Sequence, residues 1–222
     1  MNILKKLGWV GIAAASLWIT ATAGTNGFYI PTFRGQPGTT SSLWETFTVP
    51  TGAPGNRPNT GTDLSPVLTQ WAQGALITGT GNIYNMTEAG VFSISYSSTA
   101  PLGLVVLQMR TFGTELDYNS VRLSYDGGVL LTTRTETDRV QVGQPGTPGS
   151  GVYVSSAWQW DLTGRNVGQY SISFNAAEHS LSFDSALLDV QAVPEPGTLA
   201  LMAIGAGFLV VGLRRRRSGS GE

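Results

Sequence analysis

Short runs of alternating apolar and polar residues recur through the middle of the chain, separated by Gly, Pro, Asn and Asp. Phe92, Ile94 and Tyr96 alternate with serines, which is the pattern of a half-buried strand. The same region contains no sustained apolar stripe at i, i+3, i+4 and i+7. Residues 28–192 are therefore predicted to form about nine β-strands.

Some of these strands have individual signatures. Residues 43–49 alternate, so Leu43, Phe47 and Val49 are expected to share one face with Glu45. Residues 104–107 are apolar on both faces and predict a central strand. The run 126–128, Asp-Gly-Gly, predicts a hairpin turn. The other strands are expected at 75–85, 121–125, 129–142, 152–162, 170–175 and 181–190, and loops at 50–66 and 143–151.

The fold class follows from the absence of helical patterns. A sheet of this size must cover its apolar face, and without helices a second sheet does so. We therefore expect an all-β fold, an antiparallel β-sandwich of jelly-roll type. No internal repeat points to a propeller or solenoid. The long loop at 50–66 is either mobile or a ligand-facing rim, and we favour mobility.

The N-terminal segment 1–23 is typical of a signal peptide. Lys5 and Lys6 precede an apolar run at 7–19, and Ala21 and Ala23 occupy the two positions that signal peptidase reads. Cleavage is predicted after Ala23. An uncleaved membrane anchor is the alternative, but the apolar run is short for a membrane span.

The C-terminal segment has three parts. Pro194, Glu195 and Pro196 are followed by seventeen uncharged residues, 197–213. As a helix, this run would extend over about 25 Å, enough for a thin bilayer. The basic cluster that follows is expected to stay cytoplasmic, which places the preceding domain outside. The cluster consists of Arg214, Arg215, Arg216 and Arg217, and a short tail at 218–222 follows it.

Together, the Pro-Glu-Pro tripeptide, the Gly-rich apolar run and the arginine cluster at 193–217 resemble the PEP-CTERM sorting signal of Gram-negative bacteria. The resemblance implies recognition by an exosortase, which would process the chain near 194–196. It also implies association with exopolysaccharide or biofilm matrix. An ordinary C-terminal anchor that is never processed is the alternative. Both interpretations place the domain at 24–192 outside the cytoplasm.

Composition narrows the choice of chemistry. The 222 residues include no cysteine, which excludes disulfides and thiolate metal sites. Between residues 24 and 193 the chain has seven arginines, no lysine and twelve acidic residues. A mildly acidic domain lacks the basic surface that nucleic-acid binding requires. No nucleic-acid partner and no cofactor are therefore predicted.

Two pairs of residues are candidates for ligand binding. Trp158 and Trp160 share one face of a strand and could stack on sugar rings, although burial in the core is the commoner fate of tryptophan. Asp184 and Asp189 lie in a stretch that looks like the closing strand of jelly-roll carbohydrate-binding modules, which implies a structural calcium. The two carboxylates are expected on opposite faces, so we prefer simple solvation and predict no metal site.

Catalytic sets are scarce. His179, the only histidine, is expected near the start of the last strand and forms no evident Ser-His-Asp set. Glu136 and Asp138 are expected on one strand face about 7 Å apart, a spacing that glycosidase carboxylates use. Their arginine-rich surroundings favour an ordinary charged surface. No catalytic residue is predicted.

The leading hypothesis is an exported, non-enzymatic surface or matrix protein that acts by adhesion, matrix association or glycan binding. Its expected partners are signal peptidase, an exosortase, the membrane and exopolysaccharide. One alternative is a sandwich-fold polysaccharide hydrolase or lyase with Glu136, Asp138 and Asp161 in a groove. Another is a purely structural surface protein.

Overall fold

A computed structural model of the chain describes residues 27–193, and every regular element in this range is a β-strand. This confirms the all-β prediction. The predicted signal peptide, the Pro-Glu-Pro motif, the apolar span and the arginine cluster lie outside the described residues. Within 27–193, no helix is long and apolar enough to cross a membrane.

Thirteen strands form two antiparallel sheets in this part of the chain. The eight-stranded sheet consists of β1 (Thr39–Trp44), β2 (Thr60–Gly61), β4 (Ala75–Ile77), β5 (Ile83–Asn85), β7 (Leu102–Gly113), β10 (Thr135–Val142), β11 (Gly151–Asp161) and β13 (Leu181–Ala192). The five-stranded sheet consists of β3 (Val67–Gln70), β6 (Val91–Ser97), β8 (Leu116–Tyr125), β9 (Gly128–Leu131) and β12 (Gln169–Ala176).

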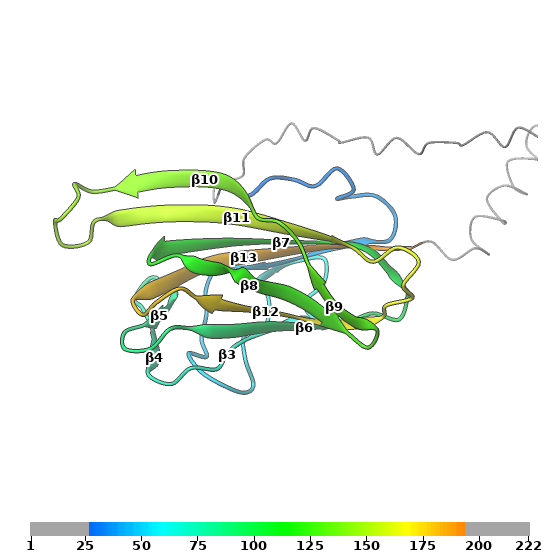
Figure 1. The fold of residues 1–222 in the computed structure, drawn as a ribbon, viewed down its shortest axis with the longest axis horizontal. Coiled ribbons are helices and arrows are strands. Elements are labelled where there is room, and N and C mark those ends of the chain that lie inside the picture. The colour runs from blue at the N-terminus through cyan, green and yellow to red at the C-terminus, as the bar shows by residue number, and fades with distance from the viewer. Residues whose placement is uncertain (1–26, 194–222) are drawn as a thin grey trace, which may run out of the picture.

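The two sheets lie one above the other (Figure 1). The larger has the order β10-β11-β7-β13-β1-β2, and the β4–β5 hairpin joins it through β5 and β13. The smaller has the order β3-β6-β12-β8-β9. Strand β7, which contains the apolar run at 104–107, lies between β11 and β13 and is central as predicted.

Both sheets contribute to one core. Phe92 of β6 stacks on Phe174 of β12, with ring centroids 5.1 Å apart, and on Phe183 of β13, with centroids 4.9 Å apart. Leu107 of β7 and Ile94 of β6 are also fully buried in this core. A core shared between two facing antiparallel sheets is consistent with the predicted β-sandwich.

The strand predicted at 43–49 ends early, at Trp44. Trp44 is fully buried, and its indole N–H donates a hydrogen bond of 2.9 Å to the Asn56 carbonyl. Phe47 remains in the core, because the chain turns after Trp44 and leaves the ladder with β13. The loop predicted at 50–66 contains strand β2. Its residue Asn56 also exchanges two backbone hydrogen bonds with Leu68 of β3, which argues against the predicted mobility.

Two predicted strands are each two strands in the structure. Residues 75–85 form the β4–β5 hairpin, which turns around Gly81. Residues 129–142 divide into β9, in the smaller sheet, and β10, in the larger. The break at residues 132–134 therefore carries the chain from one sheet to the other.

Residues 27–38 form an N-terminal strap across the outer face of the eight-stranded sheet, the blue segment in Figure 1. Tyr29 and Phe33 pack there on Val106 and Ala157, in a cluster separate from the main core. Gln108 fixes the strap, because its side chain accepts a hydrogen bond from the Tyr29 N–H and donates one to the Tyr29 carbonyl, at 2.8 and 2.9 Å.

Candidate ligand-binding cleft

A cleft of about 580 Å³ opens where the strap meets the β10–β11 edge of the larger sheet. Its size lies within the range of about 300–1,000 Å³ that is usual for small-molecule sites. Threonine is its commonest lining residue. The lining consists of Gly27, Tyr29, Thr132, Thr133, Thr135, Glu136, Thr137, Ala157, Trp158, Gln159 and Asp161.

Sheet register explains how these residues meet. Thr135 of β10 lies opposite Ala157 of β11, so both side chains are on the outer face of the sheet. Gln159 and Asp161 follow at intervals of two along β11 and share that face. Thr132 comes from the crossover between β9 and β10. The cleft thus combines residues from three segments of the chain: the strap, residues 132–137 and residues 157–161.

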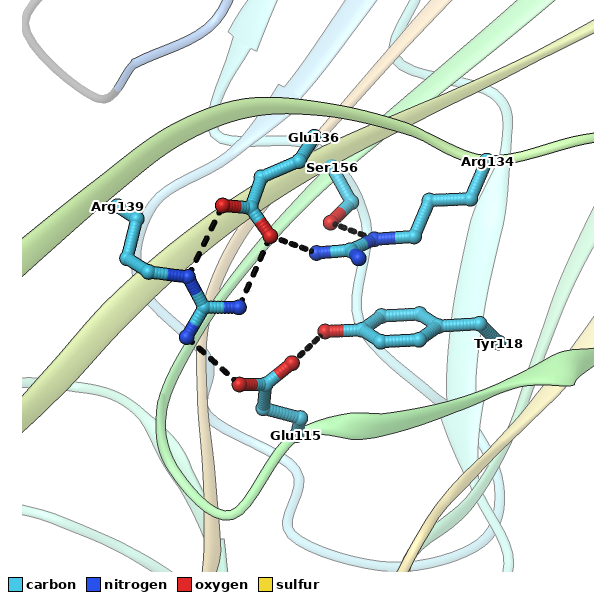
Figure 2. Close-up of polar contacts among 6 residues, drawn as sticks. All are labelled: Glu115, Tyr118, Arg134, Glu136, Arg139 and Ser156. Carbon is cyan, nitrogen blue, oxygen red and sulfur yellow. Dashed lines mark hydrogen bonds and ion pairs between the residues drawn. The ribbon is translucent and has the colours of Figure 1, made fainter.

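Glu136 is held at the cleft by two arginines (Figure 2). Its carboxylate accepts one hydrogen bond from Arg134, at 2.6 Å, and two from Arg139, both at 2.9 Å. Arg139 also donates to Glu115 at 2.8 Å. Because Glu115 lies between β7 and β8, this charged network joins the β10 edge to the β7–β8 turn.

Tyr118 of β8 completes the network from the smaller sheet, as Figure 2 shows. Its hydroxyl donates to Glu115, and its ring lies 3.7 Å below the Arg134 guanidinium carbon. Arg134 also donates from Nε to the Ser156 hydroxyl at 2.8 Å. Arg134 is therefore fixed by a carboxylate, a hydroxyl and an aromatic face.

Different local contacts set the ionisation of the three titratable groups that line the cleft. Hydrogen bonds from Arg139 lower the pKa of Glu136 to about 2. Hydrogen bonds from Thr163 lower the pKa of Asp161. Burial raises the pKa of Tyr29, so its phenol stays protonated. At neutral pH the cleft therefore contains two carboxylates, one of them neutralised by arginines, and a neutral phenol.

A β-bulge lies in the wall of the cleft. Glu136 pairs with Ser156, Asp138 pairs with Ser155, and Thr137 is the extra residue between them. The buried Thr137 hydroxyl has no hydrogen-bond partner among the described residues, and the same holds for the indole N–H of Trp158. Bulges re-aim side chains at strand edges, often beside functional sites.

The bulge also corrects the prediction that Glu136 and Asp138 share a face. Their partners Ser156 and Ser155 are neighbours on β11, so the two carboxylates face opposite sides of the sheet. Asp138 lies instead beside Gly27 of the strap, where a Cβ on that glycine would come within 2.6 Å of it.

The predicted glycan contacts, Trp158 and Trp160, both lie in the main core and are 1% and 2% exposed. Their ring faces are covered, so their placement favours the core alternative over sugar stacking. The Trp160 indole N–H donates to the Leu130 carbonyl at 3.2 Å. Trp158 also lines the cleft, and its N–H has no such partner within residues 27–193.

The two aspartates of β13 have protein partners. Arg34 holds Asp189, whereas Asn82 donates to Asp184 at 3.2 Å. In the described part of the chain, no group of three or more His, Cys, Asp and Glu residues could hold a metal ion. His179 lies just before β13, where its carbonyl accepts a hydrogen bond from Thr114.

Sequence reasoning missed most of the cleft. Tyr29 and Gln159 show no motif, and their proximity depends on how the strap crosses the sheet. One local signal was available, since residues 132–137 read Thr-Thr-Arg-Thr-Glu-Thr. Trp71 was also missed. Its side chain is 53% exposed, with the indole N–H bonded to Ser93 on the smaller sheet.

Comparison with known proteins identifies one segment of the chain. Residues 192–217 match the PEP-CTERM protein-sorting motif, which confirms the resemblance seen in the sequence. This motif suggests an exported protein sorted by an exosortase, with that enzyme as processing partner. The curated proteins contain no significant match to the chain.

Proposed function

We propose that the chain is an exported, non-enzymatic protein of the cell surface or extracellular matrix, delivered there by an exosortase. The observation that carries this proposal is the PEP-CTERM motif at residues 192–217. Signal peptidase would cleave after Ala23. The domain at 24–192 would then lie outside the membrane, held at first by a helix at 197–213 whose arginines stay inside.

The end of the folded domain supports this arrangement. Strand β13 ends at Ala192, and the Val193 N–H donates a last hydrogen bond, of 2.8 Å, to the Pro101 carbonyl. Processing near 194–196 would therefore remove the anchor without cutting a strand. The sandwich would remain intact after release.

The order of the longer strands supports a jelly-roll sandwich. In the larger sheet, β1 pairs with β13, and β7 lies between β13 and β11. In the smaller sheet, β12 lies between β6 and β8, and β9 follows. The first strand, β1, thus pairs with the last, β13, and the chain passes repeatedly from one sheet to the other in between, as in a jelly roll built of Greek keys.

The ionisation of the cleft favours binding over hydrolysis. A glycosidase needs one carboxylic acid with a raised pKa to protonate the leaving group. In the cleft, the pKa values of Glu136 and Asp161 are both lowered. Glu136 also uses both oxygens to bind arginines. The hydrolase alternative is therefore less well supported than a matrix-binding role.

Intact-mass measurement of the protein from its native host tests the proposal. In wild-type cells, we expect a chain that begins at Gly24 and ends near 194–196. In cells without the exosortase, the same chain should retain residues through 222. A product that keeps both ends in both strains contradicts the proposal.

A further inference from the structure

We propose that the cleft between the N-terminal strap and the β10–β11 edge binds a neutral saccharide segment of the matrix. This inference rests on the proposed function and names the site and ligand class through which the domain would act. Three observations support it: unsatisfied hydrogen-bonding groups, the charge of the lining, and two orphaned groups in the wall.

The lining has hydroxyl and amide groups free to bind. The side chains of Thr132, Thr133, Thr135 and Gln159 make no hydrogen bond to other described residues. A threonine hydroxyl both donates and accepts, and a glutamine side chain also does both. Sugar hydroxyl groups have the same dual character, so a polyhydroxylated ligand can satisfy every one of these groups.

The charge of the cleft selects against anionic ligands. Among the residues of 27–193 that line it there is no lysine or arginine, and its two carboxylates are ionised at neutral pH. Arg134 and Arg139 are committed to Glu136, which neutralises that carboxylate. The one remaining negative charge, on Asp161, would repel a uronate, sulfate or phosphate group but can accept a hydrogen bond from a sugar hydroxyl.

The two orphaned groups provide the third observation. Trp158 and Thr137 both line the cleft. The Trp158 indole N–H and the Thr137 Oγ1 are buried and have no hydrogen-bond partner among the described residues. Leaving a buried polar group unpaired destabilises the folded protein. Both atoms are closed off from solvent in the free protein, so a sugar hydroxyl or a bridging water would reach them only after a local opening of the lining. That destabilisation would then be relieved when ligand binds.

The test uses the mature protein purified from producing cells and titrates it calorimetrically with three probes. Cellohexaose and mannohexaose are neutral, and hexagalacturonate is their anionic counterpart. We expect at least one neutral oligosaccharide to bind and the uronate to bind at least tenfold more weakly. In NMR spectra of the protein, the resonance of the Trp158 indole N–H should shift when the oligosaccharide binds, because Trp158 lines the cleft.

Two variants locate the site. Gln159→Ala and Thr135→Val each remove a polar group from the lining and should weaken binding by about tenfold, the equivalent of one or two hydrogen bonds. Gln169→Ala is the matched control, because Gln169 is also an exposed strand glutamine but lies on β12 of the other sheet. The affinity of Gln169→Ala for the neutral oligosaccharide should equal that of the wild type.

The outcomes separate the inference from the proposed function. Absence of binding to both neutral probes, stronger binding of the uronate, or equal affinity in Gln159→Ala and wild type would each overturn the cleft assignment. The exosortase-dependent mass change would stand in all three cases. Conversely, neutral-sugar binding by a protein that is never processed would support the cleft and refute the sorting proposal.

Discussion

The Arg34 guanidinium donates two hydrogen bonds to the Asp189 carboxylate, from Nε at 2.6 Å and from Nη2 at 2.5 Å. The Asp189 side chain is fully buried, whereas that of Arg34 is 27% exposed. This bidentate pair joins the N-terminal strap to the last strand of the domain, 155 positions away in sequence. It holds the strap over the outer face of the sheet, beside the cleft.

Removing Arg34 should be strongly destabilising, because it leaves Asp189 as a buried, unpaired charge. For Arg34→Ala we expect a loss of about 3–5 kcal/mol in the free energy of unfolding at pH 7, measured by urea denaturation. Arg122→Ala is the control. Arg122 is exposed and makes no hydrogen bond or ion pair with other described residues, so its loss should change stability by less than about 0.5 kcal/mol.

The Arg34→Ala defect should also depend on pH. Burial raises the pKa of Asp189, and Arg34 opposes that rise. Without Arg34 the folded-state pKa rises further above the unfolded value, so folding favours the protonated carboxyl. The defect should then be smallest in acid and grow as pH rises above the folded-state pKa of Asp189 in the wild type, which is already higher than the ordinary aspartate value. A defect that is constant with pH would show that the lost charge pair is not its cause.

Glu136 should give the opposite pH dependence. Its pKa is about 2 in the folded protein, against an ordinary value of 4.5. The contribution of ionised Glu136 to the stability of the fold is therefore fully present above about pH 4.5 and is lost as pH falls toward 2. Thermal melts of wild type and Glu136→Gln should converge in acid and differ at neutral pH. The difference should shrink in 1 M salt, since the group is exposed and screening is strong.

The two classes of tryptophan should respond differently to truncation. Trp160→Ala removes a side chain that is 2% exposed and should cost about 3–5 kcal/mol. Trp71→Ala removes one that is 53% exposed, so the loss should stay below about 1 kcal/mol. Urea denaturation of the two variants measures both. Equal losses would mean that the packing described for β11 is wrong.

Gln108 provides a test of the strap itself. Its side chain is fully buried and makes both of its hydrogen bonds to the Tyr29 backbone. In Gln108→Leu the Tyr29 N–H and carbonyl lose these partners, at a cost of about 1–3 kcal/mol. Hydrogen exchange should accelerate in residues 29–34 and remain slow in β7. Unchanged exchange in the strap would contradict this role of Gln108.

The sequence predicted the domain best where strands alternate between core and solvent. In β6, Phe92, Ile94 and Tyr96 face the core as expected, because one face of the sheet is buried and the other is exposed. The same reasoning failed at residues 43–49, because the alternation continues past Trp44 although the strand does not. At 129–142 a single apolar-polar pattern concealed a change of sheet.

The cleft could not be predicted because it depends on non-local register. Thr135 and Gln159 become neighbours only through the pairing of β10 with β11, and Tyr29 only through the crossing of the strap. The β-bulge at Thr137 then reverses the expected relation of Glu136 and Asp138. The sorting motif was readable because its tripeptide, apolar run and arginine cluster are contiguous in sequence.

Site-specific labelling tests most directly whether the sandwich domain lies outside the cytoplasmic membrane. The chain has no native cysteine, so Gln169→Cys introduces a single thiol at an exposed position of β12. A membrane-impermeant maleimide should label this variant in intact spheroplasts of a host without the exosortase, where the anchor is retained, to the same extent as after lysis. Labelling that occurs only after lysis would place the domain in the cytoplasm and contradict the account.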